Sequence, residues 1–288
     1  CSFRRNELGA KGAPIRVCRI AAACTTCYAA VSNMKLKGKS IVVTGSSMGI
    51  GAAVARRAVA EGARVMVHGV EAEQTESVAR ELEMPSCVGD LADPSHCESL
   101  IDRTMAAFGS LHGLVNNAGV VWRNLLEDTD AAFFDSVMAV NARAPMLLIR
   151  AALPHLAKTK GYVVNIGSVN AYSGEPNLVA YSAAKGALMT LTRNLGDTLH
   201  REYGVKVNQI NPGWVGSEAE IQRKIDEGMA PDWFETLDRA EAPCGRLISP
   251  GEIASTAVHF LSDEFGPMSG QVIELSQFPF IGRNPPKC

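Results

Sequence analysis

A tyrosine and a lysine four positions apart are the residues in this sequence best suited to acid/base chemistry. Tyr181 and Lys185 stand at the start of a long stretch with helical periodicity, and residues four apart in a helix share a face. A cation beside a phenol favours the phenolate, so we expect Lys185 to lower the pKa of Tyr181 towards neutrality. Such a tyrosine can act as a general acid/base, although a Tyr and a Lys at this spacing can also be simple surface neighbours.

Ser168 strengthens the catalytic interpretation of this pair. It lies thirteen positions before Tyr181 and just past an expected strand, Tyr162 to Gly167. Its hydroxyl can hydrogen-bond a substrate oxygen beside the tyrosine and stabilise the charge that develops there. The three side chains therefore predict proton transfer at an alcohol or a carbonyl group.

Glycines in a strand-to-helix turn predict a nucleotide site. Residues 44–51 read TGSSMGIG and pass directly into a helical pattern. Glycine permits close approach of the backbone, and the N–H groups and dipole of a helix N-terminus favour an anion such as a pyrophosphate. The same glycines could serve only a tight turn, but their place on the first strand of an open parallel sheet favours a nucleotide.

The Gly-x-x-x-Gly-x-Gly spacing resembles that of the classical short-chain dehydrogenase/reductase (SDR) family, and the resemblance extends from about Lys39 to Leu275. Asp90-Leu91, the NNAG sequence at 116–119 and the Asn-Pro-Gly sequence at 211–213 follow in the family's order. Each alone could be turn chemistry. The resemblance implies cofactor contacts at Gly45, Ser47, Gly49, Ile50, Gly51, Asp90, Leu91, Asn117, Gly119, Tyr181, Lys185 and Ser217.

Asn141, expected in the fourth helix, completes a resemblance to the family's Asn-Ser-Tyr-Lys tetrad: Asn141, Ser168, Tyr181 and Lys185. The resemblance implies that Tyr181 exchanges a proton with the reacting oxygen, while Lys185 lowers its pKa and binds the nicotinamide ribose. Ser168 would orient the substrate, and Asn141 would hold a water of the proton relay. The implied enzyme is an NAD(P)-dependent oxidoreductase that interconverts a secondary alcohol and a ketone, or a sugar hemiacetal and a lactone, with the nicotinamide carrying the hydride.

The choice between NAD and NADP is left open by the end of the second expected strand. Gly69 occupies the usual position of an acid that binds the adenosine ribose, and neither Met48 nor Val70 provides an arginine for a 2′-phosphate. His68 could meet a phosphate and Glu71 could reach a ribose, or both could be solvated loop residues.

The segment 214–243 is expected to form a lid over the substrate, because it carries Trp233 and Phe234 within charged helical sequence. Ser217 supplies a hydroxyl where many family members have a threonine. Aromatic and polar residues flank the expected pocket and suit a sugar or polyol, or are ordinary loop packing: Trp122, Tyr172, Glu175 and Asn177.

The elements that must position these residues alternate between short apolar runs and helical patterns, which is typical of βαβ units. We expect helices at Ala52 to Glu61 and Glu71 to Glu83, with Gly62 ending the first. The fold class is α/β: a single doubly wound Rossmann domain with a seven-stranded, mostly parallel sheet flanked by helices. The expected strands are Ser40 to Thr44, Arg64 to His68, Ser86 to Gly89, Gly113 to Asn116, Tyr162 to Gly167, Val205 to Ile210 and Gln271 to Leu275.

Composition limits the remaining possibilities. The chain has 288 residues, is 47% hydrophobic and carries a net charge of -2, which excludes disorder of the whole chain and favours neither nucleic acid nor membrane as a partner. No uncharged apolar run reaches the ~18 residues of a membrane-spanning helix. Residues 1–33 are basic and lack strand-turn-helix patterning, so we expect a disordered, artefactual or targeting extension before a domain at 34–288.

Alternative functions depend on residues outside the tetrad or on different spacings. Cys24-x-x-Cys27 could be redox-active or half of a zinc site, but the sequence has no second pair at ligand spacing, so we predict no metal site. Most cysteines are expected to be packing thiols of a cytoplasmic enzyme, with organelle targeting possible if residues 1–33 are translated.

A cofactor-sensing regulator without turnover would be favoured by a broken tetrad, and this tetrad is intact. Enoyl reductases have a wider Tyr-to-Lys spacing, and extended sugar-nucleotide epimerases have a different glycine motif. The expected partners are a small-molecule alcohol or carbonyl substrate and further copies of the chain, in a homotetramer.

Overall fold

The computed structural model describes residues 34–172 and 174–278. The chain divides into Cys1–Asn33 and Met34–Cys288, and only the second unit is described below. The expectations for the basic extension, including Cys24 and Cys27, lie outside the described residues.

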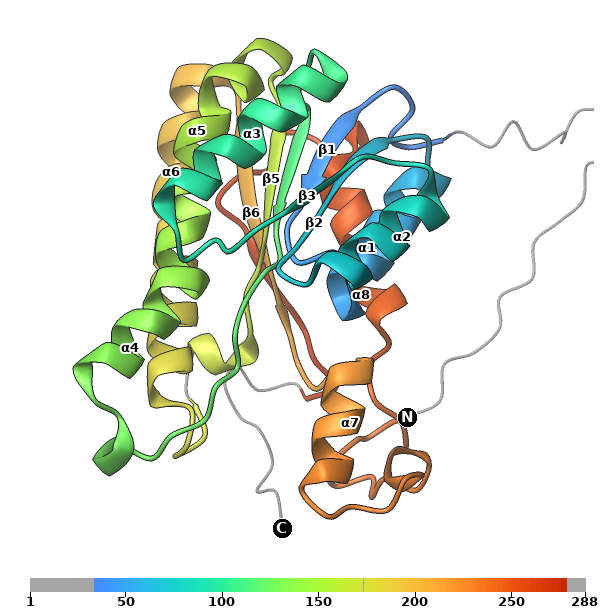
Figure 1. Ribbon diagram of the computed structural model, residues 1–288, viewed down its shortest axis with the longest axis vertical. Coiled ribbons are helices and arrows are strands. Elements are labelled where there is room, and N and C mark those ends of the chain that lie inside the picture. Colours follow the sequence, from blue (N-terminus) through green and yellow to red (C-terminus); the bar gives the residue numbers. More distant parts are fainter. Residues whose placement is uncertain (1–33, 173, 279–288) are drawn as a thin grey trace, which may run out of the picture. The chain divides into compact units, whose positions relative to one another are not determined.

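Seven parallel strands form one sheet in the order β3-β2-β1-β4-β5-β6-β7. Figure 1 shows this sheet between its covering helices. The predicted doubly wound α/β fold is confirmed, and the sheet is entirely parallel across the described residues rather than mostly so. Each strand lies within two residues of its predicted bounds. The strands are β1 (Ser40–Val43), β2 (Arg64–Gly69), β3 (Ser86–Val88), β4 (Gly113–Asn116), β5 (Tyr162–Ile166), β6 (Lys206–Pro212) and β7 (Val272–Leu275).

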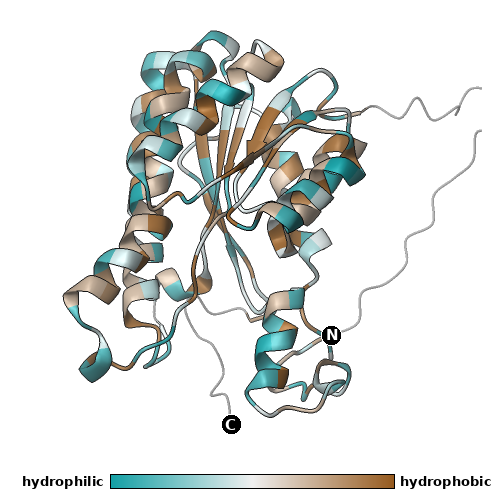
Figure 2. Ribbon diagram, viewed as in Figure 1, coloured by the Kyte–Doolittle hydropathy of each residue, from teal (hydrophilic) through white to brown (hydrophobic). Residues whose placement is uncertain are grey.

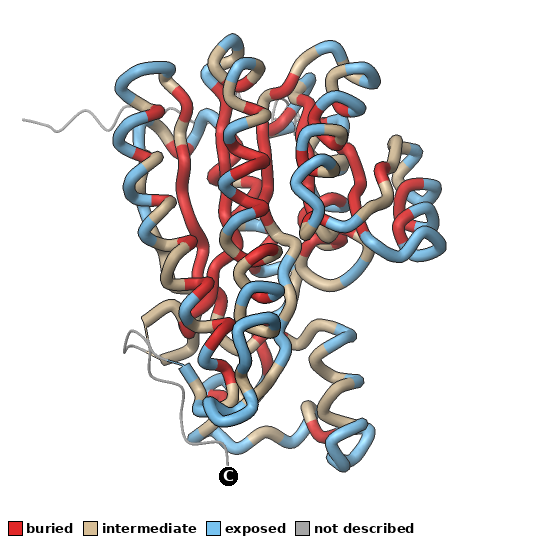
Figure 3. The backbone as a smooth tube through the Cα atoms, turned by 60° about the vertical axis from the view of Figure 1, so that its left-hand side comes forward, coloured by how far each residue is buried: buried red, intermediate tan, exposed pale blue. Residues whose placement is uncertain are grey.

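Apolar strand sequences form this sheet because both of its faces are covered by helices. Successive side chains point to opposite faces, so Ile41 and Val43 join one hydrophobic core and Val42 joins the other. The central strands are accordingly hydrophobic in Figure 2 and buried in Figure 3. The helices are α1 (Gly49–Ala60), α2 (Ala72–Leu82), α3 (Pro94–Phe108), α4 (Ala131–Met138), α5 (Ala144–Thr159), α6 (Val179–Tyr203), α7 (Glu218–Asp226) and α8 (Pro250–Leu261).

Helices α1 and α8 cover one face of the sheet, and α3, α5 and α6 cover the other (Figure 1). The predicted helices at residues 52–61 and 71–83 correspond to α1 and α2. Gly62 follows the end of α1 with φ +88°, a conformation that glycine adopts without penalty, as its predicted role as a helix stop requires.

One continuous helical stretch, Ala131–Thr159, is the single helix among the described residues that is long and apolar enough to cross a membrane by length and composition. It consists of α4, a π-helical turn at Ala139–Arg143, and α5. Leu148 and Leu156 of this stretch are buried in the core beneath the sheet, so core packing accounts for its apolar composition.

All seven strands run in one direction, so the segments that follow them meet at one edge of the sheet. The strand order reverses between β1 and β4, and ligands of open parallel sheets bind outside the carboxyl ends of the strands at such a reversal. The fold therefore brings the glycine-rich turn after β1 and the NNAG sequence after β4 to the same crevice.

Candidate active site

The glycine-rich turn after β1 is fixed by side chains from the turn after β4. Asn117 Nδ2 donates to the carbonyl oxygens of Thr44 and Gly45, both at 2.9 Å. The Thr44 hydroxyl in turn accepts hydrogen bonds from the backbone N–H groups of Asn117, at 2.9 Å, and Ala118, at 3.0 Å. The NNAG sequence thus holds the turn in shape through polar groups of both segments.

The same turn is built for close approach of a ligand to the backbone. Gly45 and Gly49 have φ values of +60° and +55°, and a Cβ at Gly51 would overlap with the carbonyl oxygen of Gly45 and with Asn117 Nδ2. Within the described residues, no side chain caps α1 at Met48 and no acid lies in its first turn. The N–H groups of that turn and the helix dipole fit the pyrophosphate of a dinucleotide, so the predicted cofactor contacts around residues 45–51 have a suitable geometry.

The adenosine end of the crevice corrects one expectation about cofactor choice. His68 is 1% exposed, its Nδ1 accepts from the Gly45 N–H at 3.3 Å, and its ring lies 3.3 Å from His96 between their Nε2 atoms. Burial, and then the neighbouring His96, lower the pKa of His68 to about 4. His68 is therefore a buried imidazole whose ring nitrogens already face Gly45 and His96, and it does not present a charged group to a phosphate.

A side chain at position 69 also has no room. A Cβ at Gly69 would overlap with Thr75 Oγ1 and crowd Ser47. Glycine at position 69, in place of the usual acidic residue, therefore fits the space that Thr75 and Ser47 leave. Ser47 lies beside this position.

Asp90 and Leu91, the predicted adenine contacts, take different roles. Asp90 is exposed beyond the end of β3, and its Oδ1 accepts from the Ala92 N–H at 2.8 Å. Leu91 is 3% exposed and packs in the core with Cys97. The side chain of Leu91 is therefore structural, because it points into the core, and only its backbone can face a nucleotide.

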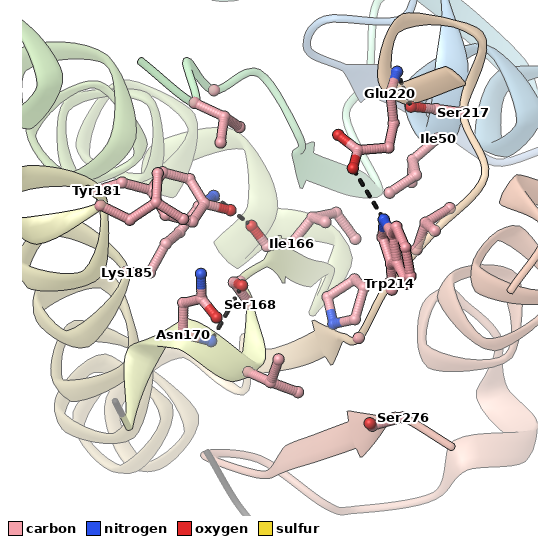
Figure 4. Close-up of a pocket in the computed structure, with 18 of the residues that line it drawn as sticks. Ile50, Ile166, Ser168, Asn170, Tyr181, Lys185, Trp214, Ser217, Glu220 and Ser276 are labelled. Atoms are coloured by element: carbon pink, nitrogen blue, oxygen red, sulfur yellow. Dashed lines mark hydrogen bonds between the residues drawn. The ribbon is translucent and has the colours of Figure 1, made fainter. Parts of the chain in front are cut away.

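Ser168, Tyr181 and Lys185 meet at one end of a cavity, as the sequence predicted (Figure 4). Ser168 caps a short 3₁₀ turn, Val169–Ala171, and its Oγ accepts from the Asn170 N–H at 3.1 Å. The hydroxyl hydrogen therefore remains available for the Tyr181 phenol or for a substrate oxygen. Tyr181 lies in the first turn of α6, and Lys185 lies one turn further along.

Burial controls the protonation of this pair. Lys185 is 4% exposed, its Nζ donates to the Ile166 carbonyl oxygen at 2.8 Å, and burial lowers its pKa to about 8. Burial also raises the pKa of the Tyr181 phenol above its usual value, against the opposing effect of the Ser168 hydrogen bond. The expected lowering of the Tyr181 pKa is therefore wrong for the protein alone, because desolvation outweighs the favourable contacts.

Asn141 lies in the π-helical turn rather than in a regular helix. Its Oδ1 accepts from the Val120 N–H at 3.1 Å, and its Nδ2 donates to the Val120 carbonyl oxygen at 2.9 Å. A Cβ at Gly119 would come within 2.6 Å of Asn141 Oδ1 and 3.5 Å of Lys185 Nζ. The side chain thus fixes the segment after NNAG beside Lys185, and its role in a water relay stays a prediction.

The cavity has a volume of about 260 Å³ and includes several of the residues expected around the substrate. Glu175 lines it, whereas Trp122, Tyr172 and Asn177 are absent from its described lining. Tyr172 instead hydrogen-bonds Glu274 of β7, and Asn177 Oδ1 accepts a hydrogen bond from Arg123 Nη1 at 3.3 Å. Loop geometry, which the sequence does not encode locally, decides which of these neighbours face inward.

Arg123, Trp214 and Glu220 also line the cavity. Arg123 was not predicted from the sequence, and its Nη1 lies 3.0 Å from Glu175 Oε2. Trp214 and Glu220 lie in the segment predicted as a lid. Trp214 Nε1 donates to Glu220 Oε1 at 2.8 Å, and Figure 4 shows both facing Tyr181 across the pocket.

The segment predicted as a lid contributes one wall of the cavity. Trp214 stacks on Trp233 with ring centroids 5.4 Å apart, and Arg223 holds Glu220 through two hydrogen bonds. Ser217, one of the predicted cofactor contacts, caps α7, and its Cβ would lie 3.4 Å from a Cβ at Gly49. The wall and the glycine-rich turn therefore adjoin, and opening of this wall as a lid stays a prediction.

Two of the three described cysteines are buried, as the expected packing role requires. Cys87 and Cys97 are buried and Cys244 is exposed, all as free thiols. Across residues 34–172 and 174–278, no group of His, Cys, Asp or Glu has the arrangement of a metal site.

Comparison with known proteins identifies relatives of similar length. A family model described as "Enoyl-(Acyl carrier protein) reductase" matches residues 44–276. The chain is 35% identical to 2-(S)-hydroxypropyl-CoM dehydrogenase 3 of Xanthobacter autotrophicus, over 82% of this chain and 94% of the relative. It is 36% identical to mouse L-fucose dehydrogenase, over 80% of this chain and 84% of the relative. The crystal structure of a dehydrogenase/reductase from Sinorhizobium meliloti superposes with a TM-score of 0.73 at 34% identity, covering 85% and 96% of the two chains.

Replacing Gly51 by alanine tests the glycine-rich turn. The added methyl group overlaps with the Gly45 carbonyl oxygen and Asn117 Nδ2, so we expect affinity for NADH and NADPH to fall about tenfold or more. Fluorescence titration of both reduced cofactors measures the change. The control is Gly251→Ala in α8, where a Cβ would meet only Ser249 Oγ at 3.8 Å. Unchanged affinity in a folded Gly51→Ala protein would contradict the assignment of this turn.

Replacing Lys185 by methionine tests the cost of burying its charge. Below about pH 8 the lysine is protonated in both the folded and the unfolded chain, so folding carries the full cost. As the pH rises from about 8 towards 10.5, the folded protein releases the proton first and the cost disappears. We expect the gain in unfolding free energy from Lys185→Met to be larger at pH 7 than at pH 10 by at most roughly 3 kcal/mol.

Denaturant unfolding at both pH values measures this difference. Lys158→Met, which removes an exposed lysine of α5, is the control for loss of a positive charge. An equal effect of Lys185→Met at the two pH values would show that burial does not shift the Lys185 pKa.

Proposed function

The chain belongs to the short-chain dehydrogenase/reductase family, and from this premise we propose that Tyr181 is its general acid/base and that its substrate is a sugar or polyol. The family assignment makes it an NAD(P)-dependent enzyme that interconverts alcohols and carbonyl compounds. The nicotinamide supplies the hydride acceptor or donor, and the protein supplies binding, orientation and proton transfer.

The convergence of Ser168, Tyr181 and Lys185 at one end of the cavity carries the proposal. The Ser168 oxygen accepts from the Asn170 N–H, so its hydrogen can be donated to a substrate oxygen placed next to the phenol. Tyr181 then gives a proton to that oxygen during carbonyl reduction, or removes one during alcohol oxidation. Burial raises the pKa of Tyr181, which favours the protonated phenol that carbonyl reduction requires.

Lys185 supports Tyr181 and holds the cofactor ribose. One of its three N–H groups is donated to the Ile166 carbonyl oxygen, which fixes the ammonium 5.7 Å from the centre of the Tyr181 ring. The other N–H groups can bind ribose hydroxyls. With a pKa of about 8 the group is mostly charged at neutral pH, so it favours phenolate formation when the tyrosine transfers its proton.

The opposite wall of the cavity supports a sugar or polyol as substrate. Trp214 presents a ring held in place by Trp233 and Glu220, and an aromatic ring provides an apolar surface for the C–H face of a sugar. The charged pair of Arg123 and Glu175 supplies donors and acceptors for hydroxyl groups. The similarity to L-fucose dehydrogenase supports the same substrate class.

Both nicotinamide cofactors remain compatible with the site. Gly69 offers no acid that would repel a 2′-phosphate, and the exposed neighbour Val70 offers no arginine that would attract one. A regulator without turnover is not favoured, since Asn141, Ser168, Tyr181 and Lys185 are all present. The four-residue spacing from tyrosine to lysine favours alcohol and carbonyl chemistry over enoyl reduction. The homotetrameric state and the cytoplasmic location stay predictions.

Tyr181→Phe tests the general acid/base. Removing the hydroxyl leaves the ring and the other cofactor contacts in place, so we expect turnover to fall by at least about a hundredfold while NADH and NADPH still bind. Initial rates on sugars, polyols, simple secondary alcohols and ketones, followed by nicotinamide absorbance, measure the change. Wild-type rates in the Tyr181→Phe variant would show that Tyr181 is not the general acid/base.

Arg123→Met tests the substrate class. A substrate hydroxyl that loses a charged hydrogen-bond donor should bind about tenfold more weakly, so KM should rise for sugars or polyols and change little for a simple secondary alcohol. Arg150→Met, at an exposed ion pair on α5, is the matched control. If only simple alcohols and ketones are turned over, the substrate class is wrong while the role of Tyr181 stands.

A further inference from the structure

Asn211, near the end of β6, is a fully buried amide that contacts the backbone of Ser168. Its side chain is 0% exposed. Its Oδ1 accepts from the Ser168 N–H at 3.1 Å and from Gln209 Nε2 at 2.7 Å. Neither Asn211 nor Gln209 lines the cavity within the described part of the chain, whereas Ser168, whose backbone Asn211 binds, does line it.

The contact is needed because the sheet ends just before Ser168. The pairing of β5 with β6 reaches Ile166 opposite Ile210, and the Gly167 N–H donates to the Ile210 carbonyl oxygen at 2.7 Å. The next N–H, that of Ser168, turns away from the ladder and is buried. An unpaired buried N–H is costly, and Asn211 Oδ1 supplies the acceptor that the backbone cannot.

Gly167 makes room for this arrangement. A Cβ at position 167 would overlap with Asn211 Oδ1 and with Gln209 Nε2. Asn211 Oδ1 and Gln209 Nε2 are hydrogen-bonded to each other, and both side chains are fully buried, so these two atoms have little freedom to move away. Gly167 and the side chains of Gln209 and Asn211 therefore form one closely packed set.

The set is anchored in the centre of the domain. The Thr192 hydroxyl of α6 lies 2.8 Å from Gln209 Oε1, and Asn165 Nδ2 donates to Thr192 Oγ1 at 2.8 Å. Asn116 Nδ2 donates to Asn165 Oδ1 at 2.8 Å. Buried polar groups from β4, β5, β6 and α6 are thus linked, and α6 is the helix that carries Tyr181.

We propose that Asn211 is a positioning residue that sets the Ser168 hydroxyl against Tyr181 by holding the Ser168 backbone, with Gln209 and Gly167 fixing the Asn211 side chain. This inference rests on the proposed role of Ser168. Displacement of a reacting group by about 1 Å is enough to slow a reaction by about a hundredfold, so the rate of the chemical step is the quantity that Asn211 controls.

The test is Asn211→Ala in the full chain and in a Ser168→Ala background. We expect kcat to fall about ten- to a hundredfold with the KM for NADH or NADPH changed less than about twofold. In the Ser168→Ala background the further loss from Asn211→Ala should be less than about twofold, because a positioning residue has no effect without the group it positions. Single-turnover measurements with stoichiometric enzyme keep the slow variants measurable.

Asn208→Ala is the matched control, since Asn208 is an equally buried amide of β6 that bonds the Met268 carbonyl oxygen and the Gln271 N–H instead. It should lower the unfolding temperature without changing kcat by more than about twofold. If Asn211→Ala does not fold, Gly167→Ala serves instead. It leaves every hydrogen-bonding side chain present but displaces Asn211, and it should give the same fall in kcat.

An equal loss from Asn211→Ala in both backgrounds, or no loss of kcat, would overturn the inference. Full activity of Ser168→Ala would instead overturn the proposed function of Ser168. The two failures are therefore distinguishable.

Discussion

Parallel strands end at one edge of a sheet, and the backbone groups that follow the last ladder pair must find hydrogen-bond partners elsewhere. In this protein side chains supply many of those partners. Asn117 and Thr44 join the turns after β1 and β4, Asn141 holds Val120, and Asn211 accepts from Ser168. The edge where a parallel sheet needs such partners is also where its ligands bind, so the same hydrogen bonds that complete the fold shape the active site.

The burial of Tyr181 and Lys185 is a second constraint on the site. The fold encloses Tyr181 and Lys185, which raises the pKa of the phenol and lowers that of the ammonium. Each shift disfavours the charged form that proton transfer must create or use. A cavity that excludes water also strengthens the interactions between these groups and the reacting oxygen. Burial thus destabilises the charged forms of these side chains in the folded protein, and it strengthens their interactions with the reacting oxygen during proton transfer.

The residues proposed to transfer the proton and those proposed to contact the rest of the substrate lie on different walls of the cavity. Tyr181 lies in α6 and Ser168 follows β5, whereas Trp214 and Glu220 belong to the segment after β6 (Figure 4). The sheet and α6 thus position the groups that are proposed to react, and the segment after β6 provides the opposite wall, where the substrate is proposed to bind.

The sequence by itself determined the seven strands, a mostly parallel sheet and the pairing of Tyr181 with Lys185, because periodicity and helical spacing are local properties of the chain, and the order of its motifs added Ser168. Only the tertiary structure decided the direction of the Tyr181 pKa, the burial of His68 and the inward position of Arg123. Those properties depend on desolvation and on contacts between residues far apart in sequence. The hydrogen bond from Ser168 to Asn211 is of the same kind, since it joins residues forty-three positions apart and follows from the register of β5 against β6.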